Sequence, residues 1–150
     1  MSQPNNFIND LSVVDMIDYL THEARQAQVL LGQSSHLIRC SALTKIAERI
    51  RALSKQIVAA NQLDLSNAND KQLPSSFVDR LTLTPERIND MAAGVENIAQ
   101  MPDPLGKTLS KWNVESGLEI ERISTSLGTI GIIYESRPNV TIDAGALCLK

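Results

Sequence analysis

The residues best suited to chemistry follow one apolar segment near the end of the sequence. Residues 127–134 are apolar on both faces and β-branched, which is typical of a buried parallel strand. The polar side chains directly after it are Glu135, Ser136, Arg137 and Asn139, with Pro138 stiffening the turn. Ligands of open α/β sheets bind at the carboxyl ends of the strands, so this loop is the predicted site.

Two side chains of this loop have a specific chemical use. The Asn139 amide is able to donate to an acyl oxygen that gains negative charge during a reaction. The Arg137 guanidinium is able to hold a carboxylate or a phosphate with two parallel N–H groups. The same spacing also fits a capped turn, with Asn139 as the N-cap of the next helix and Arg137 as a surface charge. Spacing alone leaves both interpretations open.

The remaining chemically versatile residues indicate no second site. Cys40 lies in an expected helix, and Cys148 lies between two leucines, so we interpret them as inert or core thiols. His22 and His36 have no Cys or His partner at ligand spacing, which predicts that there is no metal site. The glycines of residues 128–131 do not form the phosphate-binding Gly-x-Gly-x-x-Gly pattern, and we interpret them as close packing or a strand entry.

Helical periodicity dominates the first hundred residues. Ser12 is expected to cap a helix that ends at a left-handed Gly32, and Ser34 or Ser35 starts a second helix that extends to about residue 60. Residues 61–73 indicate a short helix and a turn, and residues 76–81 a brief helical turn.

A third strong helix and a hairpin follow. Thr84 and Pro85 are helix-start residues, and the expected helix continues to about Gln100. Its apolar face comprises Ile88, Met91, Ala92, Val95, Ile98 and Ala99. Residues 107–124 alternate loosely around Gly117, which predicts a β-hairpin, and residues 140–150 are expected to be helical.

The composition excludes several classes of protein. The chain has 150 residues, 43% of them hydrophobic, which is enough for a packed core. Its net charge of −3 and its 3% of aromatic residues argue against a nucleic-acid binder. No apolar stretch reaches the length of a membrane span. Two cysteines and the absence of a signal-like amino terminus predict a cytoplasmic protein.

The sequence resembles the γ-glutamyl phosphate reductase family, also called glutamate-5-semialdehyde dehydrogenases, of the aldehyde dehydrogenase superfamily. The resemblance is carried by residues 127–150, and above all by the specific run Tyr-Glu-Ser-Arg-Pro-Asn-Val-Thr at 134–141. Residues 79–88, 103–106 and 117–122 match further family segments in the same order. One departure is Ser126, where the family commonly has proline.

The resemblance implies the NADPH-dependent reduction of L-glutamyl 5-phosphate to L-glutamate 5-semialdehyde and phosphate in proline biosynthesis. It implies that Asn139 donates its amide to the acyl oxygen, and that the cofactor, NADP, is bound by Glu135, Ser136, Arg137 and Pro138. It also implies that the catalytic cysteine lies beyond Lys150, because neither Cys40 nor Cys148 matches its position. The 150-residue chain alone is therefore expected to be inactive.

The resemblance also implies the organisation of the chain. The expected fold is α/β: a flexible arm at 1–10, a helical part at 11–106, a hairpin at 107–126 similar to the superfamily's oligomerisation ribbon, and the start of a Rossmann-like NADP-binding domain at 127–150. The implied partners are the small-molecule substrate, further copies of the chain, and glutamate 5-kinase as the supplier of that substrate. The short arm after Met1 argues against a bifunctional protein with a kinase ahead. The alternatives are another member of the superfamily or a non-enzymatic helical interaction module.

Overall fold

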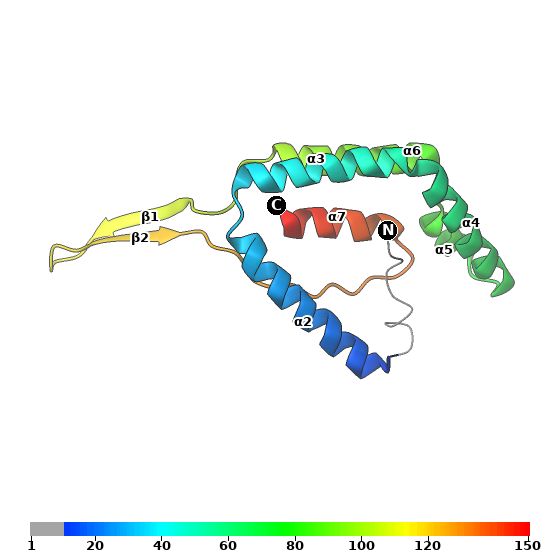
Figure 1. Ribbon diagram of the computed structural model, residues 1–150, viewed down its shortest axis with the longest axis horizontal. Helices are drawn as coiled ribbons and strands as arrows, with labels where there is room; N and C mark the ends of the chain where they lie inside the picture. The colour runs from blue at the N-terminus through cyan, green and yellow to red at the C-terminus, as the bar shows by residue number, and fades with distance from the viewer. Residues whose placement is uncertain (1–10) are drawn as a thin grey trace. The chain divides into compact units, whose positions relative to one another are not determined.

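Figure 1 shows the protein as a computed structural model, which describes residues 11–150 and leaves the predicted arm at 1–10 outside the described residues. The helices are α2 (Val13–Gly32), α3 (His36–Ala52), α4 (Ser54–Asp70), α5 (Ser75–Leu81), α6 (Pro85–Gln100) and α7 (Pro138–Leu149), and the strands are β1 (Thr108–Asn113) and β2 (Glu119–Ile123). Two compact units form: residues 11–34 with 126–131, and residues 35–125 with 132–150. Among these residues, no helix has both the length and the apolar character needed to cross a bilayer.

Hydroxyl side chains begin three of the helices, as the sequence predicts. In each case the oxygen accepts a hydrogen bond from a backbone N–H three residues ahead, one of the groups that a helix start leaves unpaired. The pairs are Ser12 with Asp15 on α2, Ser35 with Ile38 on α3, and Thr84 with Arg87 on α6. The structure thus decides for Ser35 over Ser34 as the start of α3.

Two predicted helix ends are wrong. Gly32 is not left-handed; α2 ends at Gln33, whose φ of −91° is open to any residue. The second helix does not continue to residue 60, because the chain turns at Leu53 and α4 replaces the expected short helix and turn. The Leu53 N–H still reaches the Arg49 carbonyl at 3.0 Å, and the Leu53 carbonyl accepts from Ile57 at 3.0 Å. The backbone therefore bends without losing its hydrogen bonds. The apolar periodicity continues across the bend, so the sequence pattern does not indicate where the chain turns.

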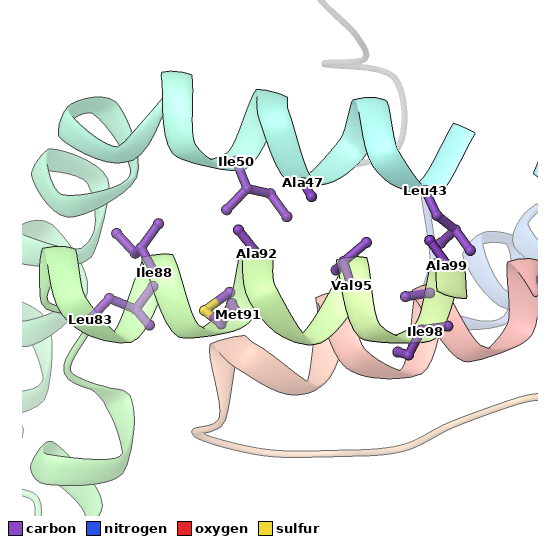
Figure 2. Close-up of a cluster of buried hydrophobic side chains, with 11 residues drawn as sticks. Leu43, Ala47, Ile50, Leu83, Ile88, Met91, Ala92, Val95, Ile98 and Ala99 are labelled. Carbon is purple, nitrogen blue, oxygen red and sulfur yellow. The ribbon is translucent and has the colours of Figure 1, made fainter. Parts of the chain in front are cut away.

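The core lies in the second unit, where α3 and α6 run side by side (Figures 1 and 2). Leu43, Ile88 and Val95 are fully buried, and α7 contributes Ala146. All six residues of the predicted apolar face of α6 are buried, which confirms that prediction. In α2, by contrast, no residue is buried. The interior of the described chain is therefore built around α6, which holds α7 in place.

The β-hairpin forms at the predicted place. β1 and β2 pair antiparallel, with Trp112 opposite Ile120, and Gly117 takes a φ of +84° in the connecting turn. Every residue of both strands is exposed. The Lys111 ammonium lies between Glu119 and Glu121, at 2.5 Å and 2.9 Å, on one of these exposed faces.

The predicted buried strand at residues 127–134 does not form. The segment has no regular structure, and Leu127 and Ile133 are almost fully exposed. A strand requires a neighbour to pair with, and the sheet of residues 11–150 consists of β1 and β2 alone. Close packing at the two glycines is also wrong: nothing lies within 4 Å of a Cβ placed on Gly128 or Gly131, and Gly128 has a φ of +89°. The described fold is thus helix-rich with a two-stranded antiparallel sheet.

Candidate functional site

Asn139 lies in the first turn of α7 rather than at its cap. Pro138 is the first helical residue, where its missing N–H costs nothing, and Arg137 is the cap residue without a side-chain cap hydrogen bond. The interpretation of Asn139 as N-cap is therefore wrong. Its side chain is free of capping and instead donates through Nδ2 to Asp143 Oδ2, 3.2 Å away and one helical turn further on.

This hydrogen bond determines how the Asn139 amide is oriented. An Asn side chain has two donor hydrogens on nitrogen and an acceptor oxygen, and a carboxylate only accepts. Asp143 therefore selects the nitrogen side of Asn139, and the second hydrogen on that nitrogen is left for another acceptor. Helix α6 packs behind the carboxylate: a Cβ on Gly94 would lie 3.9 Å from Asp143 Oδ1. The pair is thus held between α6 and α7.

Asn139 and Arg137 both line an open cavity of about 490 Å³ in the second unit. Ligand sites in proteins typically have volumes of roughly 300–1,000 Å³. The cavity is formed by α5, the α5–α6 link, α6 and the start of α7, and its lining residues are Asp79, Arg80, Thr82, Leu83, Arg87, Asp90, Met91, Arg137, Asn139 and Asp143. Three guanidinium groups and three carboxylates therefore share this wall, which suits a ligand that carries both signs of charge.

Arg87 fixes one wall of the cavity. Its Nη1 donates to the carbonyls of Asp79 at 2.6 Å and Thr82 at 2.9 Å, and its Nη2 donates to Asp79 Oδ1 at 3.1 Å. These bonds close the end of α5 onto the start of α6. The sequence pattern did not identify Asp79, Arg87 or Asp90 as site residues, because they lie about 50 residues before Asn139 and only the packing of α7 on α6 brings them together.

The loop before α7 has one strained residue with an unused polar atom. Ser136 has a φ of +55°, which non-glycine residues adopt only when their surroundings enforce it. Its Oγ is buried, and no hydrogen-bond partner for it lies among the described residues. A buried hydroxyl without a partner is costly, so the Ser136 Oγ has an unused capacity for a hydrogen bond. Glu135 beside it is exposed.

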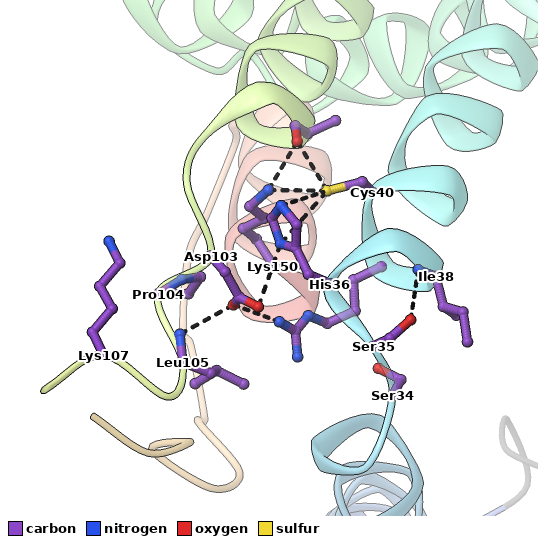
Figure 3. A network of polar contacts seen from close by, with 12 residues as sticks. Ser34, Ser35, His36, Ile38, Cys40, Asp103, Pro104, Leu105, Lys107 and Lys150 are labelled. Carbon is purple, nitrogen blue, oxygen red and sulfur yellow. Dashed lines mark hydrogen bonds and ion pairs between the residues drawn. The ribbon is translucent and has the colours of Figure 1, made fainter. Parts of the chain in front are cut away.

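A second polar cluster surrounds Cys40 at the opposite end of α7 (Figure 3). The thiol donates to the Ala99 carbonyl at 3.1 Å, and it lies 3.1 Å from Lys150 Nζ and 3.5 Å from His36 Nε2. The prediction that His36 has no cysteine partner is therefore wrong. The four-residue spacing of His36 and Cys40 on one helix was enough to predict their contact from the sequence. The approach of Lys150, by contrast, depends on how α7 packs.

Asp103 joins this cluster from the segment after α6. Its Oδ1 accepts from the Leu105 N–H at 3.1 Å, which lowers the pKa of the Asp103 carboxyl below its usual value. The nearby positive charges of Arg39 and His36 lower that pKa further; the buried Arg39 donates to Oδ1 at 2.6 Å, and His36 Nδ1 lies 3.6 Å from Oδ2. Asp103 thus remains ionised and anchors the start of α3.

Neither thiol lies near the Asn139 amide. Cys40 contacts Lys150, which lies eleven positions after Asn139, a rise of about 16 Å along α7. Cys148 lies about 14 Å along the same helix. It is also exposed, so the interpretation as a core residue is wrong: α7 buries Ala146 and leaves the face that carries Cys148 uncovered. Among residues 11–150, the cavity therefore has no nucleophilic thiol.

Comparison with known proteins shows what the chain is similar to. It is 47% identical over 135 residues to a γ-glutamyl phosphate reductase of Gluconobacter oxydans, covering 90% of this chain and 31% of that protein. It is 46% identical to that of Mesorhizobium japonicum, covering 94% of this chain and 33% of the relative. No model of a protein family matches the chain. The chain therefore spans about a third of the length of these relatives.

Solved structures agree with the sequence matches. The crystal structure of γ-glutamyl phosphate reductase from Thermotoga maritima superposes with a TM-score of 0.84 and 36% identity, over 89% of this chain and 32% of that chain. The enzyme from Saccharomyces cerevisiae gives a TM-score of 0.82 and 30% identity, over 87% of this chain and 33% of that chain. The predicted resemblance is confirmed, and the alternative of a non-enzymatic interaction module is not favoured.

Proposed function

We propose that this chain, whose sequence and fold match about one third of the γ-glutamyl phosphate reductases, is the amino-terminal part of such an enzyme. The complete enzyme would reduce L-glutamyl 5-phosphate to L-glutamate 5-semialdehyde and phosphate in proline biosynthesis. The observation that carries this proposal is 44–47% identity over about nine-tenths of the chain to enzymes of that name. The oriented Asn139 amide on an open cavity supports it.

The role of this chain in the reaction is to stabilise the negative charge on the acyl oxygen and to hold the Asn139 amide in one orientation. Negative charge develops on the acyl oxygen when a thiolate attacks the acyl phosphate and again when the thioester is reduced. The second N–H of the Asn139 amide donates to that oxygen, and Asp143 holds the amide so that nitrogen faces the reacting group. The thiolate comes from outside residues 11–150, since neither described thiol lies within reach of Asn139.

The loop from Glu135 to Pro138 is the proposed contact for the cofactor, and the side chain of Ser136 is suited to this contact. Its buried Oγ is a polar atom that lacks a partner in the described chain, as expected where a polar group of a cofactor binds. We propose NADPH as that cofactor, and it supplies the hydride that reduces the acyl carbon. Arg137 has its backbone in the same loop, and its side chain lines the cavity.

The remaining organisation follows from the same proposal. Residues 127–150 begin the nucleotide-binding domain, residues 11–106 form the helical part, and the hairpin at 107–126 pairs with further copies of the enzyme. Its fully exposed strands, with apolar side chains such as Trp112, support a role in assembly. Glutamate 5-kinase supplies the acyl phosphate. The two free cysteines support a reducing, cytoplasmic location.

The test is the complete enzyme with γ-glutamyl phosphate and NADPH, followed by NADPH consumption and phosphate release. Replacing Asn139→Ala should lower kcat by about 10²-fold or more with little change in the KM for NADPH, because one donor to the developing oxyanion is lost. Asn67→Ala on the exposed face of α4 is the matched control and should retain full activity. A wild-type rate in Asn139→Ala would remove this residue from its role, and no NADPH consumption by the wild type would refute the proposed function.

A further inference from the structure

Two of the charged side chains that line the cavity have no hydrogen-bond, ion-pair or aromatic partner among residues 11–150. Of the three guanidinium groups, Arg87 is bonded to Asp79, and Arg80 lies over the ring of Phe77, 5.8 Å from its centroid. The third guanidinium, that of Arg137, makes no hydrogen bond or ion pair with any residue that the structure describes. It is exposed beside the same cavity as Asn139.

The three carboxylates of the cavity also comprise groups with a partner and a group without one. Asp79 is paired with Arg87, and Asp143 accepts from Asn139. The third carboxylate, that of Asp90 on α6, is exposed and has no hydrogen bond or ion pair among residues 11–150. Apart from Arg80, which lies over the Phe77 ring, the described cavity therefore offers the Arg137 guanidinium as an unpaired cation and the Asp90 carboxylate as an unpaired anion, and Asn139 lines the same cavity.

The dimensions of the proposed substrate place its charged end close to Asn139. In a γ-glutamyl group, three carbon–carbon bonds separate the reacting acyl carbon from the carbon that carries the ammonium and carboxylate, a span of about 4 Å. If Asn139 holds the acyl oxygen, both charged groups must be bound within the immediate surroundings of that residue. A cavity of about 490 Å³ accommodates such a group without any larger movement.

We propose that this cavity binds the α-amino acid end of the substrate, with Arg137 holding the α-carboxylate and Asp90 the α-ammonium. The inference rests on the proposed function and names the specificity residues of that site. The planar guanidinium of Arg137 binds a carboxylate through two N–H groups, and the Asp90 carboxylate accepts from the ammonium. An acyl phosphate without these charges would leave both residues unpaired, so the site discriminates against it.

Three acyl phosphates allow the contributions of Arg137 and of Asp90 to be measured separately in the complete enzyme. γ-Glutamyl phosphate has both charged groups, glutaryl phosphate lacks the ammonium, and butyryl phosphate lacks the ammonium and the carboxylate. Asp90→Asn should reduce the ratio of kcat/KM for γ-glutamyl over glutaryl phosphate about 10- to 100-fold, since a charge-assisted hydrogen bond is lost. Arg137→Gln should reduce the ratio for glutaryl over butyryl phosphate by a similar factor.

The controls are Asp64→Asn on α4 and Arg49→Gln on α3, which change the same charges at exposed positions outside the cavity and should preserve both ratios. Asp90→Glu keeps the charge and should restore much of the first ratio. Wild-type ratios in Asp90→Asn and Arg137→Gln, with γ-glutamyl phosphate still reduced, would overturn the subsite alone. A wild-type enzyme that reduces none of the three acyl phosphates would overturn the proposed function and the subsite together.

Discussion

At the scale of the residue, the Asn139–Asp143 pair explains how an amide is held ready for chemistry. The pair lies one helical turn apart on α7, and the carboxylate accepts from Nδ2 at 3.2 Å. Without that acceptor the amide is able to rotate and present its oxygen, which repels a negatively charged acyl oxygen. In the proposed mechanism, Asp143 is thus a positioning residue that acts through Asn139.

Asp143→Ala should lower kcat of the complete enzyme about tenfold, less than Asn139→Ala, because a hydrogen bond to a charged group is lost while the donor remains. The decisive measurement is a double-mutant cycle. If Asp143 acts through Asn139, the combined variant Asn139→Ala/Asp143→Ala should be no slower than Asn139→Ala alone. Independent, multiplying losses would contradict the positioning role.

Asp103 predicts a pH dependence of stability. Its folded pKa lies below the unfolded value, chiefly because of the Leu105 N–H, so its ionised form stabilises the fold. That contribution is fully present above the ordinary pKa of 3.8 and is lost as the pH falls through the lower folded pKa. In urea unfolding, the wild type should therefore have a higher free energy of unfolding than Asp103→Asn at neutral pH. This difference should become smaller in acid. A difference in free energy of unfolding that does not change with pH would contradict the stabilising role of the ionised Asp103 carboxylate.

At the scale of the element, one buried amide joins three helices. Asn61 on α4 donates through Nδ2 to the Leu81 carbonyl at 2.9 Å and accepts from the Leu83 N–H at 2.8 Å. Leu81 is the last residue of α5, and Leu83 belongs to the link between α5 and α6 and lines the cavity. Asn61 thereby satisfies buried backbone groups that the helices themselves leave unpaired.

Asn61→Ala should lower the free energy of unfolding by about 1–3 kcal/mol, because it leaves a buried donor and a buried acceptor without partners. The matched control Asn67→Ala on the exposed face of the same helix should stay within about 0.5 kcal/mol of the wild type. Thermal unfolding of the complete protein measures both. Equal stability of the two variants would show that the Asn61 bridge contributes little.

At the scale of the whole molecule, the site is assembled from parts that are far apart in sequence. Cys40, His36 and Asp103 gather at one end of α7, and Asn139 lies at the other, where it borders the cavity (Figure 3). The backbone positions of Asn139 and Lys150 are about 16 Å apart along the axis of α7. Among residues 11–150, no thiol therefore lies beside the Asn139 amide.

The isolated chain of 150 residues should therefore catalyse no NADPH oxidation with γ-glutamyl phosphate, whereas the complete enzyme should do so. Adding the Cys40→Ala change to the complete enzyme should leave its rate within about twofold, since this thiol lies too far from Asn139 to attack the same acyl group. Turnover by the isolated chain, or loss of activity in Cys40→Ala, would contradict the assignment of the nucleophile to another part of the protein.

The local sequence by itself determined the helix starts at Ser12 and Thr84, a further start at Ser34 or Ser35, the apolar face of α6 and the turn at Gly117, because capping, periodicity and positive φ depend on neighbours a few residues away. It also indicated Asn139 and Arg137 as candidate site residues. Only the tertiary structure decided what surrounds them. The bend at Leu53, the place of Asp90 in the cavity, the contact of Cys40 with Lys150 and the lack of a strand at residues 127–134 all depend on contacts between distant segments. A strand pattern without a neighbouring strand stays unpaired, and a carboxylate becomes part of a site only when another helix packs beside it.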